Sequence, residues 1–385
     1  MLKCASVYTY EIDDQEKALA EIKAQLEQKI TLLKYSAGII MCHPEFIESG
    51  VMQHLCENLP VDLVGTTNVS QAVNGEAGEL ILTIFVMTAD DVWFKPGITD
   101  SLLEGVDAPL KAAFEKVSAG ETGSPKLAII FPPLLIDRYA GDEYLKAVKN
   151  IIPGTPYFGM AAVNDRLNGE GSETIHNGRH RADAMSFVLC YGNINPRFFV
   201  ATLPINNAFF LNAEITKANG NLVHEINNIN ALKFFEDANF PKNMKYFPLL
   251  VNFSKRKDND GVPVIVGNTG FTEDGTAIFN IDVDEGSTLN MVTCTPNDIL
   301  STSLNEIKRI NELEDVNGVL LLPCAVRRHL LLGAGKPLAE LQIAKDVLSV
   351  PFMMCYAGGE ICPTSVKNGI PTNRFHNYSL VILVL

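Results

Sequence analysis

One phrase occurs three times along this chain, and it constrains the fold more than any single motif does. It consists of an apolar strand, a helix, a short strand and, after a Gly- and Asn-rich connection, a long alternating strand. The copies begin at residues 37, 126 and 318. In the first copy the strands read AGIIMCHPEF, VDLVGTTNV and GELILTIFVMT. Self-similarity on this scale indicates an architecture built from repeated units.

Alternation of strands and helices within each copy predicts the α/β class, with α+β as the alternative. The segments 37–69, 126–165 and 318–361 are expected to form three strand-helix-strand units. Each unit predicts a right-handed crossover between two parallel strands. The long strands add antiparallel edges, so mixed sheets are expected, either as one mixed sheet or as two packed sheets.

The region 204–297 differs in texture from the three copies. Short strand-like pieces alternate with turn signals such as Asn219-Gly220-Asn221, and one helix is expected at 230–240. We predict a small inserted antiparallel α+β region. The domains are expected at 1–203, with repeats one and two, and at 204–385, with the insert followed by repeat three at 298–385.

The last segment of the chain predicts a buried strand. Residues 377–385 read NYSLVILVL, which is apolar on both faces of an extended chain. Strands buried on both faces lie inside a sheet rather than at its edge. We therefore expect a central or near-central strand here.

Composition narrows the classes of partner. The net charge is −14 over 385 residues, which argues against a nucleic acid or an anionic membrane as the partner. The first 14 residues turn acidic, unlike a secretory signal, and no uncharged apolar run approaches the about 18 residues of a membrane span. The eight cysteines include no CxxC pair, so we expect reduced thiols in a cytoplasmic protein without a metal or cofactor.

Three segments resemble a known family. They are GIIMCHPEF with VDLVGTTNV, then LVHEINNINALKFFED, and finally VPFMMCYAGGEICP with NRFHNYSLVILVL. The chain resembles the FIST proteins, with a FIST N-terminal domain at about 30–205 and a FIST C-terminal domain at about 210–365. Asn68-Val69-Ser70 stands where the family usually has Gly-Glu. The third segment is the most specific of the three.

The resemblance implies a sensory module for signal transduction that binds a small ligand, for which an amino acid is one candidate. No output domain is expected within the chain, so a signal would pass to a signalling protein partner or through a homo-oligomer. We favour a non-enzymatic role. Two alternatives stay open: an enzyme with a Cys/His or carboxylate site in the cleft between repeats, and a protein-binding scaffold.

Candidate ligand-binding residues follow the short strands, because ligands of parallel sheets bind outside the carboxyl ends of the strands. The first copy supplies Thr66 and Thr67, and the third supplies Tyr356, Gly359 and Glu360. Glycine lets a ligand approach the backbone, and Glu360 could meet a ligand amine. The plainer alternative is that the glycines only turn the chain and Glu360 faces solvent.

The ligand's carboxylate would need a cation. Arg179 and Arg181 flank His180 in a Gly-containing loop, and Arg327 follows the third apolar strand. The alternative for the loop is a solvated basic patch. Asn373 adds a donor and an acceptor. We expect a cavity between the N-terminal repeats and the C-terminal part, with Tyr356, Glu360 and Asn373 on one wall.

A thiol nucleophile is the less favoured interpretation. Cys42 and His43 are adjacent in a strand, so their side chains point to opposite faces. Cys324 and His329 are five residues apart and would meet only across a turn. The enzyme alternative therefore depends on how the chain folds after Cys324.

Overall fold

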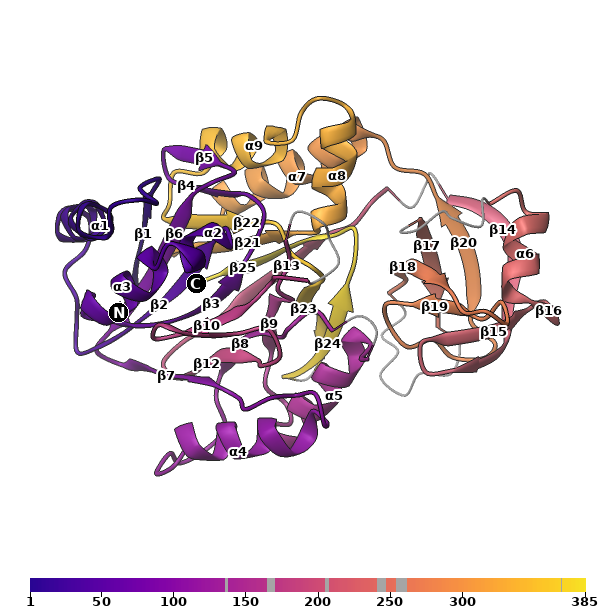
Figure 1. The fold of residues 1–385 in the computed structure, drawn as a ribbon, viewed down its shortest axis with the longest axis horizontal. Coiled ribbons are helices and arrows are strands. Elements are labelled where there is room, and N and C mark those ends of the chain that lie inside the picture. The colour runs from indigo at the N-terminus through magenta and orange to yellow at the C-terminus, as the bar shows by residue number, and fades with distance from the viewer. Residues whose placement is uncertain (136–137, 165–169, 205–207, 241–246, 254–261, 368) are drawn as a thin grey trace.

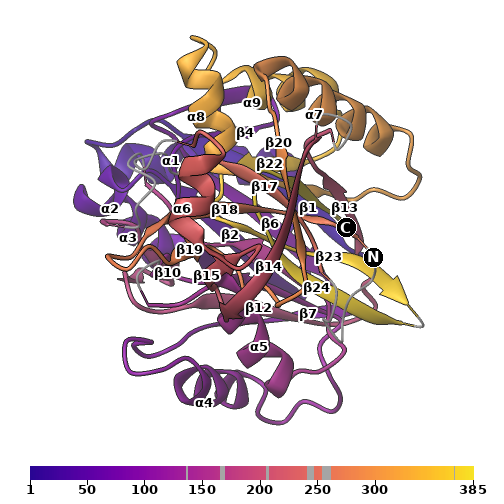
Figure 2. The same cartoon turned by 90° about the vertical axis from the view of Figure 1, so that its right-hand side faces the viewer.

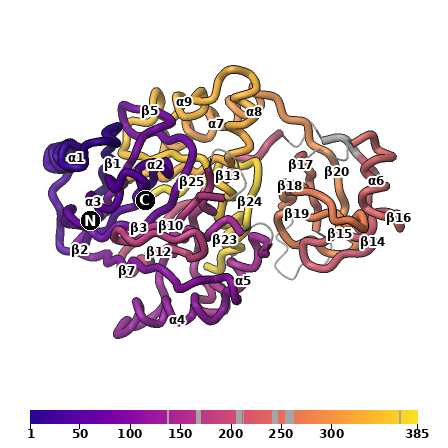
Figure 3. Tube along the Cα trace, viewed as in Figure 1, coloured from indigo at the N-terminus to yellow at the C-terminus, as the bar shows by residue number. Residues whose placement is uncertain are grey.

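A computed structural model covers residues 1–385 and describes all of them except 136–137, 165–169, 205–207, 241–246, 254–261 and 368 (Figure 1). Its elements form three α/β units and a small barrel that stands to one side of them. The helices of the three units lie outside, around the sheets (Figure 2). The chain enters the barrel after the second unit and leaves it into the third (Figure 3).

The first unit has one parallel strand pair and two antiparallel neighbours. Strands β2 and β3 are parallel, and β6 lies antiparallel between β1 and β2. Helix α1 begins after Asp14, whose side chain accepts the Lys17 N–H at 3.0 Å. The elements are β1 (Lys3–Thr9), α1 (Gln15–Lys29), β2 (Tyr35–Cys42), α2 (Glu45–Glu48), α3 (Val51–Asn58), β3 (Asp62–Thr67) and β6 (Leu82–Ala89).

The second unit repeats this strand order. Its parallel pair is β8 and β9, and β12 lies antiparallel between β7 and β8. The elements are β7 (Val92–Ile98), α4 (Asp107–Val117), β8 (Leu127–Phe131), α5 (Gly141–Ile151), β9 (Tyr157–Met160) and β12 (Ser186–Gly192).

The third unit pairs β21 with β22 in parallel, and two helices connect them, as in the first unit. Strand β25 lies antiparallel between β13 and β21, and its residues are buried. The expected buried inner strand at the end of the chain is therefore confirmed. The elements are β13 (Arg197–Ala201), α7 (Pro296–Asn311), β21 (Val319–Pro323), α8 (Ala325–Gly333), α9 (Ala339–Val347), β22 (Phe352–Cys355) and β25 (Leu380–Val384).

Each unit also sends a hairpin into the sheet of another unit. The hairpin that follows β3 pairs with β22, the one that follows β9 pairs with β3, and the one that follows β22 pairs with β9. This exchange ties the three units together by backbone hydrogen bonds. The hairpins are β4 (Gln71–Val73) with β5 (Glu76–Gly78), β10 (Thr174–His176) with β11 (Arg179–Arg181), and β23 (Glu360–Lys367) with β24 (Ile370–His376).

The inserted region forms a closed antiparallel barrel. Strand β14 pairs with both β20 and β15, which closes the sheet, and α6 lies within the helix expected at 230–240. The elements are β14 (Ala208–Asn219), β15 (Leu222–Ile226), β16 (Ile229–Asn230), α6 (Ala231–Asp237), β17 (Pro248–Asn252), β18 (Val264–Phe271), β19 (Ala277–Phe279) and β20 (Thr288–Val292).

The predicted mixed α/β class is confirmed. The number of sheets differs from both alternatives, one mixed sheet or two packed sheets. The three units form three six-stranded mixed sheets, with the barrel as a fourth. Their inner faces meet in one apolar core, to which Met41, Phe131 and Leu322 belong. Detailed equivalence of the three units stays a prediction. None of the helices in the described ranges combines the length and apolar character that crossing a membrane requires.

Candidate functional site

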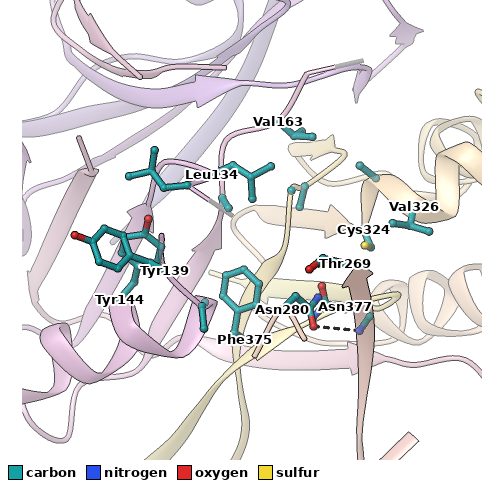
Figure 4. Close-up of a pocket in the computed structure, with 18 of the residues that line it drawn as sticks. Leu134, Tyr139, Tyr144, Val163, Thr269, Asn280, Cys324, Val326, Phe375 and Asn377 are labelled. Carbon is teal, nitrogen blue, oxygen red and sulfur yellow. Dashed lines mark hydrogen bonds between the residues drawn. The ribbon is translucent and has the colours of Figure 1, made fainter. Parts of the chain in front are cut away.

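A cavity lies where the barrel meets the second and third units (Figure 4). Its volume is about 70 Å³, so it is small beside typical small-molecule sites. Tyr139 and Tyr144 lie on the left of Figure 4, and Cys324, Thr269 and Asn377 on the right. The cavity therefore has residues from three parts of the fold around it.

One side of the cavity is aromatic and aliphatic. Tyr139 and Tyr144 pack edge to face with ring centroids 6.0 Å apart, beside Leu134. The Tyr139 hydroxyl donates to the Leu102 carbonyl at 2.9 Å, which fixes its ring. This side favours an apolar ligand body.

Phe375 lines the cavity between two glycines. A Cβ atom on Gly141 would lie 2.3 Å from the ring, and one on Gly359 would lie 2.2 Å from it. Gly359 also has φ +149°, a conformation that favours glycine. Gly359, predicted as a ligand contact, thus positions the Phe375 ring.

The other side of the cavity carries uncharged polar groups. Asn280 Oδ1 accepts the Gly267 N–H at 3.1 Å, so that amide is already oriented by the barrel. Asn377 is 6% exposed, and its Nδ2 finds no hydrogen-bond partner among the described residues. A buried donor without a partner costs free energy, which a ligand acceptor could recover.

Cys324 lines the cavity at the start of helix α8, as its N-cap residue. Its sulfur lies near the backbone N–H groups of Tyr378 and Val326 and beside the Glu360 carboxyl. Burial raises the pKa of the thiol well above its usual value, and the Glu360 charge raises it further. Cys324 therefore rests as a neutral thiol.

Glu360 lies behind Cys324 and is fully buried. Its Oε2 accepts the Ser379 N–H at 3.3 Å, whereas its Oε1 has no partner within the described part of the chain. Burial raises the pKa of this carboxyl well above its usual value, against the opposing effects of Cys324, Ser379 and Arg327. The carboxyl faces neither solvent nor the cavity surface directly.

Glu360→Gln is expected to change how stability depends on pH. Because its folded pKa is raised, the native state keeps a proton that the unfolded chain releases above pH about 4.3. Wild-type stability therefore falls as pH rises from there towards the folded pKa, by at most about 1.4 kcal/mol per pH unit. Glutamine cannot ionise, so the stability of the variant relative to wild type should grow with pH in urea titrations.

The exposed Glu27 on α1 supplies the matched control, Glu27→Gln. A constant difference between Glu360→Gln and wild type across the pH series would contradict the raised pKa of Glu360. Cys324, Arg327 and Glu340 are the side chains that shift the pKa of this carboxyl. The same titration in Cys324→Ala would therefore measure the contribution of the thiol to that pKa.

Arg327 is held inside the third unit rather than on the cavity wall. Its side chain is fully buried, and its Nη2 lies 2.7 Å from Glu340 Oε1. Its Nη1 donates to the Tyr378 carbonyl at 2.9 Å. Tyr356 is buried near the same pair, where burial and then the Glu340 charge raise its pKa. The cation and the tyrosine expected for a ligand thus belong to a buried polar cluster.

The remaining predicted residues lie elsewhere. Thr66 and Thr67 bond the Glu173 backbone, and Asn373 bonds the Tyr157 N–H and the Thr155 carbonyl at 2.9 Å each. Arg181 pairs with Asp183 at 2.9 Å, and Arg179 is exposed on β11.

The expected wall of Tyr356, Glu360 and Asn373 is not formed at this cavity, as far as the structure describes its lining. The backbone bonds of Asn373 and the burial of the other two side chains direct all three inward. Whether any of the nine residues binds a ligand stays a prediction.

Sequence reasoning missed most of the lining. Tyr139 and Tyr144 follow the second apolar strand, and nothing in their pattern marked them. Thr269 and Asn280 come from the inserted barrel, and no local sequence pattern shows where that barrel docks on the α/β units. Asn377 belongs to the closing NRFHNY segment, where the resemblance was strongest. His329, weighed as a partner for Cys324, is exposed on α8.

Family comparison agrees with the early resemblance. The model of the FIST N domain matches residues 36–229, and that of the FIST C domain matches residues 230–363. None of the curated proteins compared with the chain matches it. The domain boundary expected at 203/204 stays a prediction. Because the two models together span most of its length, the chain belongs to the FIST family.

Proposed function

We propose that this chain is a sensory protein that binds a small ligand in the cavity between the barrel and the α/β units. FIST domains are associated with sensory and signal-transduction roles. The observation that carries the proposal is a buried amide, Asn377 Nδ2, without a described partner in a cavity that is otherwise largely apolar. A ligand acceptor at this amide would satisfy it while the ligand body fills the apolar side.

The lining specifies the ligand's chemistry. Among the lining residues that the structure describes, no side chain is acidic or basic apart from the tyrosine hydroxyls and the thiol. A charged head group would meet only amides, Thr269 and the amino end of α8, which favours partial negative charge. We therefore expect an apolar body with one neutral or weakly anionic polar head. Amino acids with apolar side chains remain candidates through their carboxylate.

The cavity's position suggests how a ligand could act. Polar contacts join the barrel to the second unit. They include Gly141 N–H to the Asn280 carbonyl at 3.1 Å, Asp282 N–H to Asp142 at 2.9 Å, and an ion pair between Lys146 and Asp282. A ligand that contacts both sides adds to this interface and favours one arrangement of the barrel. The signal would then pass to a signalling partner or through self-association. Eight free cysteines support a reducing compartment such as the cytoplasm.

A thermal-shift screen of amino acids and small carbonyl, alcohol and aromatic metabolites tests the proposal. A ligand at about 100 times its Kd stabilises the native state by about 2.7 kcal/mol. Thr269→Trp is expected to abolish that shift, because Thr269 is partly exposed at the cavity and a larger side chain would fill it.

The matched control is Thr288→Trp, which adds the same side chain at an exposed position of the same barrel. It should keep the shift. Equal ligand binding by wild type and Thr269→Trp, measured by calorimetry, would remove the ligand from this cavity.

A further inference from the structure

The cavity contains a constellation that simple ligand binding does not require. Cys324 and Asn377 bring a thiol and an amide donor to its lining, and the Glu360 carboxyl lies behind the thiol. We propose that Cys324 adds reversibly to the carbonyl carbon of an aldehyde ligand in this cavity, with Glu360 carrying the thiol proton. This inference rests on the proposed function and names the ligand class.

The placement of Cys324 suits a nucleophile. It is the N-cap of α8, a helix of nine residues, so the positive end of the helix dipole lies at its sulfur. Two backbone N–H groups, those of Val326 and Tyr378, lie near the sulfur and would stabilise developing negative charge. Of the eight cysteines, Cys324 alone is among the described lining residues.

Glu360 is placed to receive the proton. Its carboxyl lies beside the thiol, and its Oε1 has no hydrogen-bond partner among the residues described. Burial raises the pKa of Glu360, so its carboxylate form is a stronger base than an exposed glutamate. Arg327 from α8 and Glu340 from α9 act on it from one side, and His376 is its register partner on β24.

Asn377 supplies the remaining group. Its Nδ2 is buried at the cavity and without a described partner, so it can donate to a ligand oxygen. An amide at this place would hold the carbonyl oxygen and stabilise the charge that develops on it.

The step balances without any other reactant. Glu360 is neutral at rest, so it first releases its proton to water. The thiol proton then moves to its carboxylate, and the sulfur forms a bond to the carbonyl carbon while the C=O π bond opens. The resulting oxyanion accepts a hydrogen bond from Asn377 Nδ2 and takes up a proton from water, so Glu360 ends neutral, as it began. The product is a hemithioacetal, nothing is oxidised or reduced, and no group leaves. Reversal of the same transfers releases the aldehyde.

Phenylacetaldehyde labelled with carbon-13 at its carbonyl is the probe, and 2-phenylethanol is its non-electrophilic match. Wild type is expected to bind the aldehyde at least about tenfold more tightly than the alcohol, and to show a bound carbon-13 signal of a saturated carbon. Cys324→Ala should bind both compounds equally and show no such signal. Glu360→Gln should form the adduct at least about tenfold more slowly.

Cys294→Ala controls for the partly exposed thiol outside the cavity and should behave as wild type. An adduct that persists in Cys324→Ala, or no adduct in wild type, would overturn the proposal. Binding of the alcohol, which cannot form an adduct, tests the proposed cavity function separately from the thiol addition. If the alcohol binds wild type and not Thr269→Trp while no adduct forms, the cavity function stands and the thiol step fails. If the adduct forms equally in Thr269→Trp, the ligand does not occupy this cavity and both fail.

Discussion

Arg327→Met is expected to lower the free energy of unfolding by about 3–5 kcal/mol, one of the two largest effects that we predict. Arg327 is fully buried, and its Nε and Nη2 donate to Glu340 Oε1 at 3.0 and 2.7 Å. Methionine fills a similar volume but leaves the Glu340 charge without its cation. Urea denaturation followed by circular dichroism measures the loss.

Two further variants sharpen this test. Arg309→Met on α7 removes an exposed arginine that pairs with Glu306, and should cost less than about 1 kcal/mol. Replacing Arg327 and Glu340 together by methionine should recover much of the loss, because no buried charge then remains uncompensated. A single Arg327→Met variant that unfolds at the wild-type urea concentration would show that the pair contributes nothing.

The role of Arg327 illustrates what sequence reasoning could not supply. Three basic residues after an apolar strand suggested a ligand cation, because local pattern gives no direction for a side chain. Helix α8 begins at Ala325, and this turn of helix directs Arg327 inward and leaves His329 exposed. Its partner Glu340 lies on another helix, α9, and no spacing rule connects the two.

Chain-level pattern predicted the strand pairs far better than it predicted the sheets. The repeated phrase led to the three parallel pairs, and apolar SLVILVL led to the inner strand β25. The exchange of hairpins between units was not foreseen. A short alternating hairpin such as β4–β5 satisfies its hydrogen bonds at any free sheet edge, so its own residues do not select one. Packing of the whole molecule makes that choice.

The sequence indicated part of the cavity's location in the fold, but few of the residues that line it. The exit of the third short strand does reach the cavity, since Ala357 and Gly358 line it after β22. Glu360 was expected on the cavity wall as a partner for a ligand amine, with a solvent-facing side chain as the alternative. It begins β23 and is buried by the strands around it. The barrel residues Thr269 and Asn280 reach the cavity through tertiary docking alone. That docking leaves no periodic signal in the sequence.

Removal of residues 379–385 is expected to prevent the third unit from folding, the other large effect. These residues include β25, which pairs with β13 on one side and β21 on the other. Leu380 to Val384 are fully buried, and each such side chain contributes roughly 1.5–3 kcal/mol. Their combined loss is comparable to the whole stability of a typical protein, about 5–15 kcal/mol. Circular dichroism and the urea midpoint of the shortened chain measure the effect.

Leu383→Ala gives the same test in graded form, because a shortened chain that does not fold yields no midpoint. Leu383 is fully buried within β25, whereas Leu332 on α8 is 47% exposed. The buried substitution should cost about 2–5 kcal/mol through lost transfer energy and the cavity left behind. Leu332→Ala, with the same atoms removed, should change stability by less than about 0.5 kcal/mol. Equal urea midpoints for the two variants would mean that β25 does not bury its side chains in solution.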